Sequence, residues 1–224
     1  MAVTEPTLTT EAQLHSGGHR YVIGCDEVGR GAIAGPVGVG MALVDAGCGA
    51  FPVGLRDSKL LSEKRREALE PLAASWALHT SVGLASAEEV DRIGLSAALG
   101  LAGARAFGAL VSAGADAAAS IVLLDGSFDW LNPALASPVA VRTRIKADRD
   151  CASVAAASVV AKVHRDRLMI EADAATPGYG WSGNKGYGSS AHYAAIAELG
   201  PTPLHRHTWL RQPALDLFDD AQTA

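Results

Sequence analysis

Cysteine is scarce in this sequence: the 224 residues include only Cys25, Cys48 and Cys151, and no CxxC pair. An odd number of widely spaced thiols argues against a disulfide framework and is typical of a reducing compartment. The first 20 residues contain Glu5 and Glu11 and no apolar core, so they do not have the pattern of a secretory signal. We therefore expect a cytoplasmic protein.

Long apolar runs and an excess of basic charge are also missing. Glycine or charge interrupts each Ala-rich stretch, so we expect no window of about 18 or more residues to span a membrane. The 19 lysines and arginines are outnumbered by 24 acids, so a nucleic-acid partner would have to be held by a local basic patch. The length and the hydrophobic content of 49% fit one globular domain, which we expect to be a monomer and to need no disulfide.

Apolar runs separated by turn signals predict an α/β fold with a mixed sheet of five strands. The run at 120–125 does not alternate, which indicates a central strand covered on both faces. The expected strands are 21–25, 37–44, 76–84, 120–125 and 139–145. The expected helices are one with Ser62 as N-cap that runs to about Ala74, a short one capped by Ser86 and Glu89, and those at 93–111, 152–170 and 191–199.

The glycines after the first strand allow two interpretations. A dinucleotide-binding turn needs GxGxxG opening into a helix. Here Gly29, Gly31 and Gly35 are spaced one residue too far apart, and Pro36 with a β-rich run follows. The spacing therefore argues against a dinucleotide site and leaves a metal site next to the glycines as the second interpretation.

Acidic residues follow three of the expected strands. Asp26 and Glu27 come after the first, Asp125 ends SIVLLD, and Asp148 follows the fifth strand. Neighbours on a regular strand point to opposite faces, so Asp26 and Glu27 can converge only where the strand ends or bends. Taken alone, such a pair is more often two solvated acids at a strand end. Ligands gather at the carboxyl ends of strands in open α/β sheets, however, and all four acids are expected there.

Four carboxylates at one edge call for cations. Two unit charges 4 Å apart repel by about 4 kcal/mol at an effective dielectric of 20. All-oxygen ligands suit Mg²⁺ or Mn²⁺ rather than zinc. A pair of such ions serves in-line phosphodiester chemistry, so the acids favour a metal-dependent nuclease.

Five blocks of sequence, in this order and spacing, resemble ribonuclease HII, the type 2 ribonuclease H family: CDEVGRGAIAGPV, DSKLLSEKRR, VLLDGS, IKADRDCASVAAASVVAKVHRDRLM and NKGYGS. The resemblance covers about residues 21 to 209. It implies a ribonuclease H-like fold with a small C-terminal helical extension. We expect a disordered segment at 1–20, a catalytic domain at 21–200 and an extension or tail at 201–224.

The resemblance also implies an activity. The family cuts the RNA strand of RNA–DNA hybrids and cuts 5′ to single ribonucleotides in duplex DNA. A two-metal-ion mechanism with Mn²⁺ or Mg²⁺ would leave 3′-hydroxyl and 5′-phosphate ends. The catalytic and metal-binding residues implied are Asp26, Glu27, Asp125 and Asp148.

Substrate-binding residues are implied in the same way. Gly29-Arg30-Gly31 would read the ribonucleotide through its backbone, and Tyr187 would pack against the sugar at the RNA–DNA junction. Glycine suits this role because backbone groups approach a 2′-OH closely only where no Cβ intervenes. Ser158 is placed near backbone phosphate. The remaining implied residues are basic and could line a groove that holds phosphates, although each one alone is more often a solvated surface charge: Lys59, Lys146, Lys162, Arg165 and Lys185.

Two alternatives to this assignment remain. Ribonuclease HIII is a relative with an extra N-terminal substrate-binding domain, for which the 20 residues before the first strand are too few. The other alternative is a catalytically silent hybrid-binding module, against which the presence of all four carboxylates argues. A silent module would hold a hybrid equally with and without Mg²⁺.

The C-terminal segment contains a possible partner motif. Gln212, Leu215, Leu217 and Phe218 resemble the short peptides by which bacterial repair enzymes bind the sliding clamp. Apolar residues near a chain end either pack on their own domain or fill a partner's pocket. Both outcomes are open from the sequence.

Overall fold

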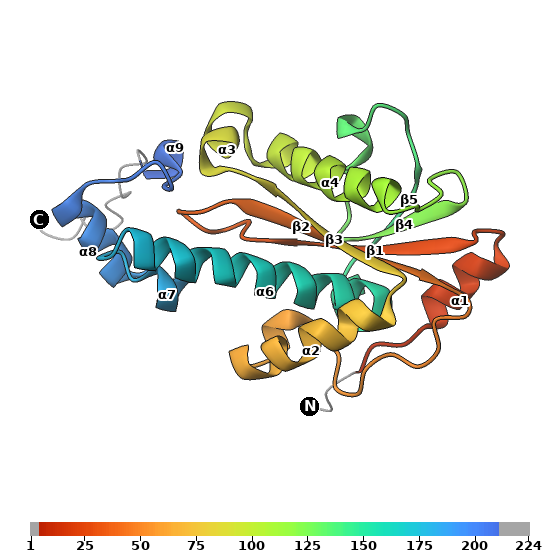
Figure 1. Cartoon of the computed structure of the whole chain (residues 1–224). Helices are drawn as coiled ribbons and strands as arrows, with labels where there is room; N and C mark the ends of the chain where they lie inside the picture. The colour runs from red at the N-terminus through yellow and green to blue at the C-terminus, as the bar shows by residue number, and fades with distance from the viewer. Residues whose placement is uncertain (1–4, 211–224) are drawn as a thin grey trace, which may run out of the picture.

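The computed structural model describes residues 5–210, which form one mixed sheet with helices on both faces (Figure 1). The strands are β1 (Tyr21–Val28), β2 (Val37–Asp45), β3 (His79–Ala85), β4 (Ser120–Asp125) and β5 (Ala140–Arg144). They lie in the order β3-β2-β1-β4-β5. β2 pairs antiparallel with β1 and β3, whereas β4 pairs parallel with β1 and β5. The predicted mixed five-stranded sheet is therefore confirmed.

The first strand is longer than the sequence predicted. We expected it to end at Cys25, but β1 continues to Val28 because Asp26 and Glu27 keep their ladder partners, Gly40 and Val39. The third strand begins later than expected, since helix α2 runs through Trp76. A regular strand through the two acids decides which faces they occupy.

Helices account for most of the remaining chain. The capping box predicted at Ser86 and Glu89 is confirmed, as is Ser62 as an N-cap. The expected helix at 93–111 begins instead at Leu95, because Gly94 takes a positive φ of 79° and separates two helices. The helices are α1 (Thr9–Ser16), α2 (Glu63–Trp76), α3 (Ala87–Ile93), α4 (Leu95–Ser112), α5 (Ala147–Asp150), α6 (Ala152–Ala175), α7 (Trp181–Asn184), α8 (Ser190–Leu199) and α9 (His207–Leu210), with short 3-10 turns η1 (Ser58–Leu60) and η2 (Asn132–Ala134).

The prediction of a disordered segment at 1–20 is wrong for its described part. Helix α1 lies against the start of α6, where Glu11 Oε1 accepts hydrogen bonds from the Ser153 backbone N–H (2.9 Å) and hydroxyl (2.7 Å). Leu14 is buried in the adjoining core. One carboxylate and one apolar contact thus fix a segment whose composition alone suggested a loose end.

Two hydrophobic cores lie on opposite faces of the sheet. Alternate residues of β1 divide between them: Val22 faces α6 and α2, whereas Ile23 faces α4. Figure 1 shows α6 lying along one face, with α2 beyond it and α4 on the other side. A Cβ on Gly24 would meet the Ser153 backbone, and one on Gly40 would meet the Ala157 carbonyl. The small residues therefore let α6 approach the sheet closely.

One described helix contradicts an expectation about membranes. By length and composition, α4 could cross a bilayer, with Arg105 as its single charged residue. The buried positions of α4, among them Leu99, Ala102 and Phe107, pack on the sheet instead. A core helix meets the same length and composition criterion as a membrane span. The glycines and the single arginine of α4 therefore do not prevent it from meeting that criterion, contrary to what the sequence had led us to expect.

The close approach of α6 to the sheet predicts an asymmetry between two glycine substitutions. Gly24→Ala should lower the free energy of unfolding by roughly 1–3 kcal/mol, because the added methyl group overpacks the sheet–helix interface. Gly108→Ala, on the open side of α4 where a Cβ meets nothing within 4 Å, should raise it by roughly 0.5–1 kcal/mol through helix propensity. Urea unfolding of both variants measures the difference. Equal changes in the free energy of unfolding would show that the contact between α6 and the sheet can accommodate an extra methyl group.

Candidate active site

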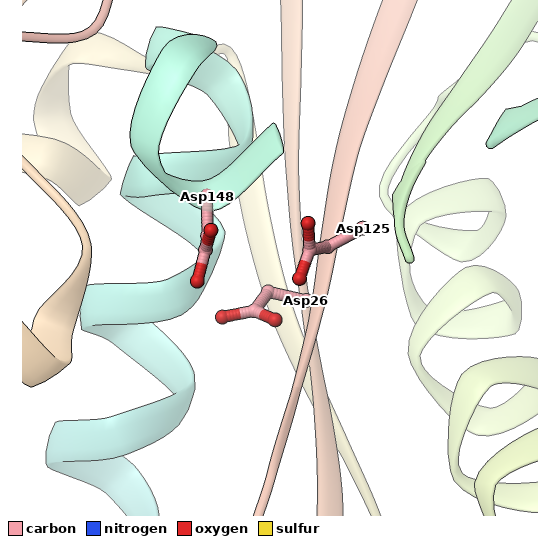
Figure 2. Close-up of side chains that lie close together, drawn as sticks. All are labelled: Asp26, Asp125 and Asp148. Atoms are coloured by element: carbon pink, nitrogen blue, oxygen red, sulfur yellow. The ribbon is translucent and has the colours of Figure 1, made fainter. Parts of the chain in front are cut away.

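Three carboxylates meet at one edge of the sheet. Asp26 lies on β1, Asp125 ends β4 and Asp148 lies in α5, and each contributes an oxygen within 4.8 Å of the others (Figure 2). β1 and β4 are parallel neighbours with Cys25 opposite Leu124, so the next residues are brought side by side. The Ala147 N–H donates to Asp125 Oδ1 at 2.7 Å and ties α5 to the end of β4.

Burial makes this concentration of negative charge costly. Asp26 is 2% exposed, and burial raises its pKa well above the usual value; Glu27 and Asp125 act in the same direction, whereas Lys59 and Ser158 oppose it. Burial and the charge of Asp148 raise the pKa of Asp125. Carboxylates whose charged forms are disfavoured gain from a cation. The all-oxygen trio fits a hard divalent ion such as Mg²⁺ or Mn²⁺.

Lys59 supplies the nearest positive charge. Its Nζ lies 3.0 Å from Asp148 Oδ2 and 4.0 Å from Asp57 Oδ1. Burial alone would lower the pKa of Lys59, but the charges of Asp26, Asp57 and Asp148 and the hydrogen bond to Asp148 raise it overall. The side chain is 66% exposed, so it can leave the carboxylates when other charges arrive.

Glu27 lies apart from the trio. Its side chain extends from the neighbouring position on a regular strand and lies 3.4 Å from Arg30 Nη1. Glu27 is not in the group that meets within 4.8 Å, because β1 continues through both acids and neighbouring strand positions point to opposite faces. Glu27 instead lines a hollow of about 340 Å³ together with Asp125, Arg30 and Phe128. Asp125 thus belongs to both the trio and this hollow.

The loop Gly29–Gly31 lies next to these acids. Gly29 has a φ of 75°, and a Cβ on Gly31 would meet nothing within 4 Å. The Arg30 side chain is 64% exposed. Beneath the loop, Arg206 donates to the carbonyls of Gly29 (2.7 Å) and Arg30 (3.1 Å). The loop is therefore held from inside and open outside.

The predicted substrate-binding residues divide by exposure. Lys146 is exposed, and its φ of 62° turns the chain from β5 into α5. Arg165 and Lys185 are buried, which contradicts a place on the groove surface: Arg165 donates to three backbone carbonyls, and Lys185 lies 3.6 Å from Glu63. Lys162 is mostly covered and pairs with Asp166 at 2.5 Å.

Ser158 also lies below the surface. It is 2% exposed, and its hydroxyl lies 2.9 Å from that of Ser58. Ser158 acts to lower the pKa of Asp26 and so favours the charged form of that carboxyl group. The prediction that Ser158 lies near phosphate is not supported by this burial, and the side chain supports the carboxylates from beneath.

Tyr187 lies on the surface next to the basic residues of α6. It is 37% exposed, with Lys162 Nζ 5.8 Å and Arg165 Cζ 5.5 Å from its ring centroid. His192 Nδ1 lies 3.0 Å from the Tyr187 carbonyl oxygen. That histidine in turn contacts His205 and Trp181 within a buried cluster. The tyrosine backbone is thus fixed while its ring stays accessible.

The sequence as a whole decides the family. Residues 23–212 match the family model described as Ribonuclease HII. The chain belongs to the ribonuclease HII family. It is accordingly an enzyme with ribonuclease H activity, and the resemblance inferred from the five sequence blocks is confirmed.

Relatives agree over most of the chain. The ribonuclease HII of Streptomyces avermitilis is 45% identical over 216 residues, which covers 96% of this chain and 88% of that protein. The ribonuclease HII of Caulobacter vibrioides is 45% identical over 192 residues, covering 86% and 85%. The RNase HII of Archaeoglobus fulgidus, solved as a PCNA:RNase HII complex, has a TM-score of 0.64 at 25% identity, covering 87% of this chain and 98% of that one. Bst-RNase HIII in complex with Mn²⁺ shares the fold, with a TM-score of 0.65 at 24% identity, covering 86% and 68%.

Sequence reasoning missed the residues that support the site from behind. Arg206, His192 and His205 are fully buried, although their residue types usually indicate exposure. Burial lowers the pKa of His205 to about 4, aided by the neighbouring His192, so the ring is neutral at neutral pH. In a single sequence, no spacing distinguishes such buried polar residues from surface ones.

The buried trio predicts opposite effects of one substitution on stability and activity. Asp26→Asn should abolish cleavage, because it removes a carboxylate ligand without losing volume. In metal-free buffer at neutral pH the same variant should unfold at a higher temperature than the parent protein, because the repulsion falls. Thermal unfolding with and without Mn²⁺, together with a cleavage assay, measures both effects.

Glu67→Gln is the matched control, since Glu67 pairs with Arg167 at 2.5 Å on α2, away from the trio. It should leave cleavage unchanged and should not stabilise the protein. Near-normal turnover by Asp26→Asn at saturating metal would contradict the assignment of the trio.

Proposed function

We propose that this enzyme hydrolyses the RNA strand of RNA–DNA hybrids and incises 5′ to single ribonucleotides embedded in duplex DNA. The products would carry 3′-hydroxyl and 5′-phosphate ends. The observation that carries the proposal is the buried carboxylate trio at the carboxyl ends of β1 and β4. Family membership supplies the substrate class, and the adjoining open glycine loop supplies a way to recognise a ribose.

The carboxylates can be assigned to two neighbouring ion positions. Asp26, Asp125 and Asp148 would hold one divalent ion, and Asp125 with Glu27 would hold a second, since Asp125 lines both places. Mn²⁺ and Mg²⁺ both suit this donor set, and the Mn²⁺ bound in Bst-RNase HIII favours testing manganese first. Bound ions would supply an activated water and neutralise charge on the cleaved phosphate.

Residues of the chain would then orient the nucleic acid. The Gly29-Arg30-Gly31 backbone faces outward beside Glu27, where a ribose 2′-OH can meet its amide groups. The Tyr187 ring would pack against the sugar at the RNA–DNA junction. Lys59, Lys146 and Arg30 are exposed cations within the same region and would contact phosphates.

A catalytically silent hybrid-binding module is the alternative function. All four carboxylates are present, and three of them are buried or half-buried at one point. Within residues 5–210, Lys59 is the one cation within 4.0 Å of these three. A binding module gains nothing from such repulsion next to a phosphate backbone. Incubating a duplex that contains one ribonucleotide with the protein and Mn²⁺, and mapping the cut, tests the proposal directly. A cut 5′ to the ribonucleotide is expected, and no cut in this duplex would favour the silent module.

The exposed tyrosine predicts a substrate-dependent loss of activity. Tyr187→Ala should lower kcat/KM at an isolated ribonucleotide by roughly ten-fold, in line with about 1–3 kcal/mol for an aromatic contact to a nucleotide. Cleavage of a continuous hybrid should fall less, because many registers are available. Tyr193→Ala is the matched control, since Tyr193 is an exposed tyrosine on α8. An equal loss on both substrates would contradict the role assigned to Tyr187.

We also propose that the C-terminal segment containing Gln212, Leu215, Leu217 and Phe218 binds the bacterial sliding clamp. These residues lie outside the described part of the chain. The Archaeoglobus fulgidus enzyme was solved in a complex with PCNA, so a relative of this fold does associate with another protein.

A peptide of residues 210–224 should bind purified clamp with a dissociation constant of about 1–100 μM, because ordering a short peptide offsets part of the contact energy. The double substitution Leu217→Ala and Phe218→Ala should abolish binding, as measured by fluorescence anisotropy. In the full-length enzyme the same change should leave cleavage of free oligonucleotides intact. Unfolding of that variant would place the segment on its own domain instead.

A further inference from the structure

Two arginines are buried beneath the glycine loop without an ionic partner. Arg165 on α6 and Arg206 before α9 are both 0% exposed. Across residues 5–210, neither guanidinium lies within 4.0 Å of a carboxylate oxygen, whereas ten other close ion pairs are present in this range. Burying an unpaired charge is unfavourable unless hydrogen bonds compensate for lost hydration. A role tied to these hydrogen bonds would explain why the charges are kept.

All the hydrogen bonds of the two side chains go to backbone carbonyls around the loop. Arg206 reaches Gly29 at 2.7 Å, Arg30 at 3.1 Å and Gly35 at 3.2 Å. Arg165 reaches Pro36 at 2.8 Å, Ala34 at 3.0 Å and Lys185 at 2.8 Å, the last just before Tyr187. The two planar guanidinium groups thus fix the backbone from Gly29 to Pro36, and Arg165 also fixes the chain at Lys185, two residues before Tyr187.

Fixing the carbonyls inward has a consequence for the amide groups. Among the described residues, nothing accepts a hydrogen bond from the N–H groups of Arg30 and Gly31, and the space beside Gly31 is open. Successive free N–H groups in a turn form a concave site for anionic or hydroxyl oxygens. The two guanidinium charges behind the turn add to its positive potential. Burial and the charge of Arg165 lower the pKa of Arg206 to about 10, so it remains charged at neutral pH.

Gly29, Gly31 and Gly35 have two different roles: some leave room for packing inside the protein, and one leaves room for a ligand. A Cβ on Gly29 would collide with Arg165 Nε, and one on Gly35 would collide with Met169 Sδ on α6. Of these three glycines, Gly31 is the one at which an added Cβ would meet no described atom within 4 Å. Gly29 is thus required for the packing of Arg165, and Gly31 is the position left free for a ligand.

Segments far along the chain hold Arg206 in place. Its own N–H donates to the Ile33 carbonyl at 2.8 Å, and its guanidinium lies 4.8 Å from the Trp209 ring centroid. Asp91 of α3 accepts from the N–H groups of His207 and Thr208. The arginine is therefore anchored on both sides before it contacts the loop.

We propose that Arg206 and Arg165 are positioning residues for ribose recognition. Arg206 turns the Gly29 and Arg30 carbonyls inward, Arg165 fixes the following chain at Ala34 and Pro36, and together they present the Arg30 and Gly31 amides to the 2′-OH of the substrate. This inference rests on the proposed cleavage at ribonucleotides. It predicts that disturbing either guanidinium weakens discrimination between a ribonucleotide and a deoxyribonucleotide without weakening attraction to the duplex in general.

Arg206→Lys tests this inference because it keeps the charge and removes the donor fork. Steady-state kinetics in Mn²⁺ would give KM and kcat on a duplex with one ribonucleotide, and the same duplex made entirely of DNA would serve as a competitive inhibitor. We expect kcat/KM to fall by about ten-fold or more, while the inhibition constant of the DNA duplex changes less than about two-fold. Amide hydrogen exchange over 29–36 in the free enzyme should become faster.

Arg105→Lys is the matched control. Arg105 also donates to a backbone carbonyl, that of Leu84 at 2.6 Å, and pairs with Glu89, but it lies on α4 away from the loop. It should leave both constants and the exchange over 29–36 unchanged. Should Arg206→Lys fail to fold, the same measurements on Arg165→Lys test the other end of the segment 29–36, where Arg165 contacts Ala34 and Pro36.

The outcomes separate this inference from the proposed function. Absence of any cut at a ribonucleotide by the unsubstituted enzyme would overturn the proposed function. Normal cleavage by the unsubstituted enzyme together with unchanged discrimination in a folded arginine variant would overturn only the positioning role. An equal weakening towards ribonucleotide and DNA duplexes would also overturn it, since that result indicates general attraction to phosphate.

Discussion

The convergence of three carboxylates within 4.8 Å at a buried edge is the constraint on which the rest of the structure depends. Such a group opposes folding unless the backbone around it is held firmly and some positive charge is near. The parallel pairing of β1 and β4 supplies the first condition, since it fixes Asp26 and Asp125 by register. Lys59, 3.0 Å from Asp148, supplies part of the second. A divalent ion would supply the remainder, so the repulsion in the free protein becomes affinity for metal.

Close packing of α6 makes this arrangement possible. Asp148 reaches the other two carboxylates only because α5 and α6 follow β5 directly and α6 lies close to the sheet. Small residues on the two sides of the contact allow that approach: a Cβ on Gly24 or Gly40 would strike the backbone of α6. Ser158, on the same helix, lies close enough to Asp26 to act against the rise of its pKa. The glycine and alanine content of the core is thus a condition for the chemistry as well as for the fold.

Much of this organisation could be predicted from the sequence, since it depends on local patterns. Four acids after expected strands indicated the edge of the sheet, and the capping box at Ser86 and Glu89 appears as predicted. The predictions failed where long-range contacts override local ones. Glu11 accepts a hydrogen bond from Ser153, which holds the polar segment that forms α1 against the domain. Pairing with β2 extends β1 beyond Asp26. Pairing across the sheet decides where a strand ends, and composition does not reveal it.

The basic residues show a second limit of sequence reasoning. A lysine or arginine in a nucleic-acid enzyme is readily assigned to phosphate binding, and Arg165, Lys185 and Ser158 were assigned in that way. Their burial keeps these side chains from contacting phosphates on the surface, and on our proposal Arg165 acts on the substrate through the backbone that it holds. A guanidinium beneath a loop has a fixed set of donors and no conformational freedom to lose on binding, whereas an exposed lysine must be ordered by each substrate. If the proposed cleavage at single ribonucleotides holds, the enzyme distinguishes one hydroxyl group and needs the first arrangement at the ribose, while the second is enough along the phosphates.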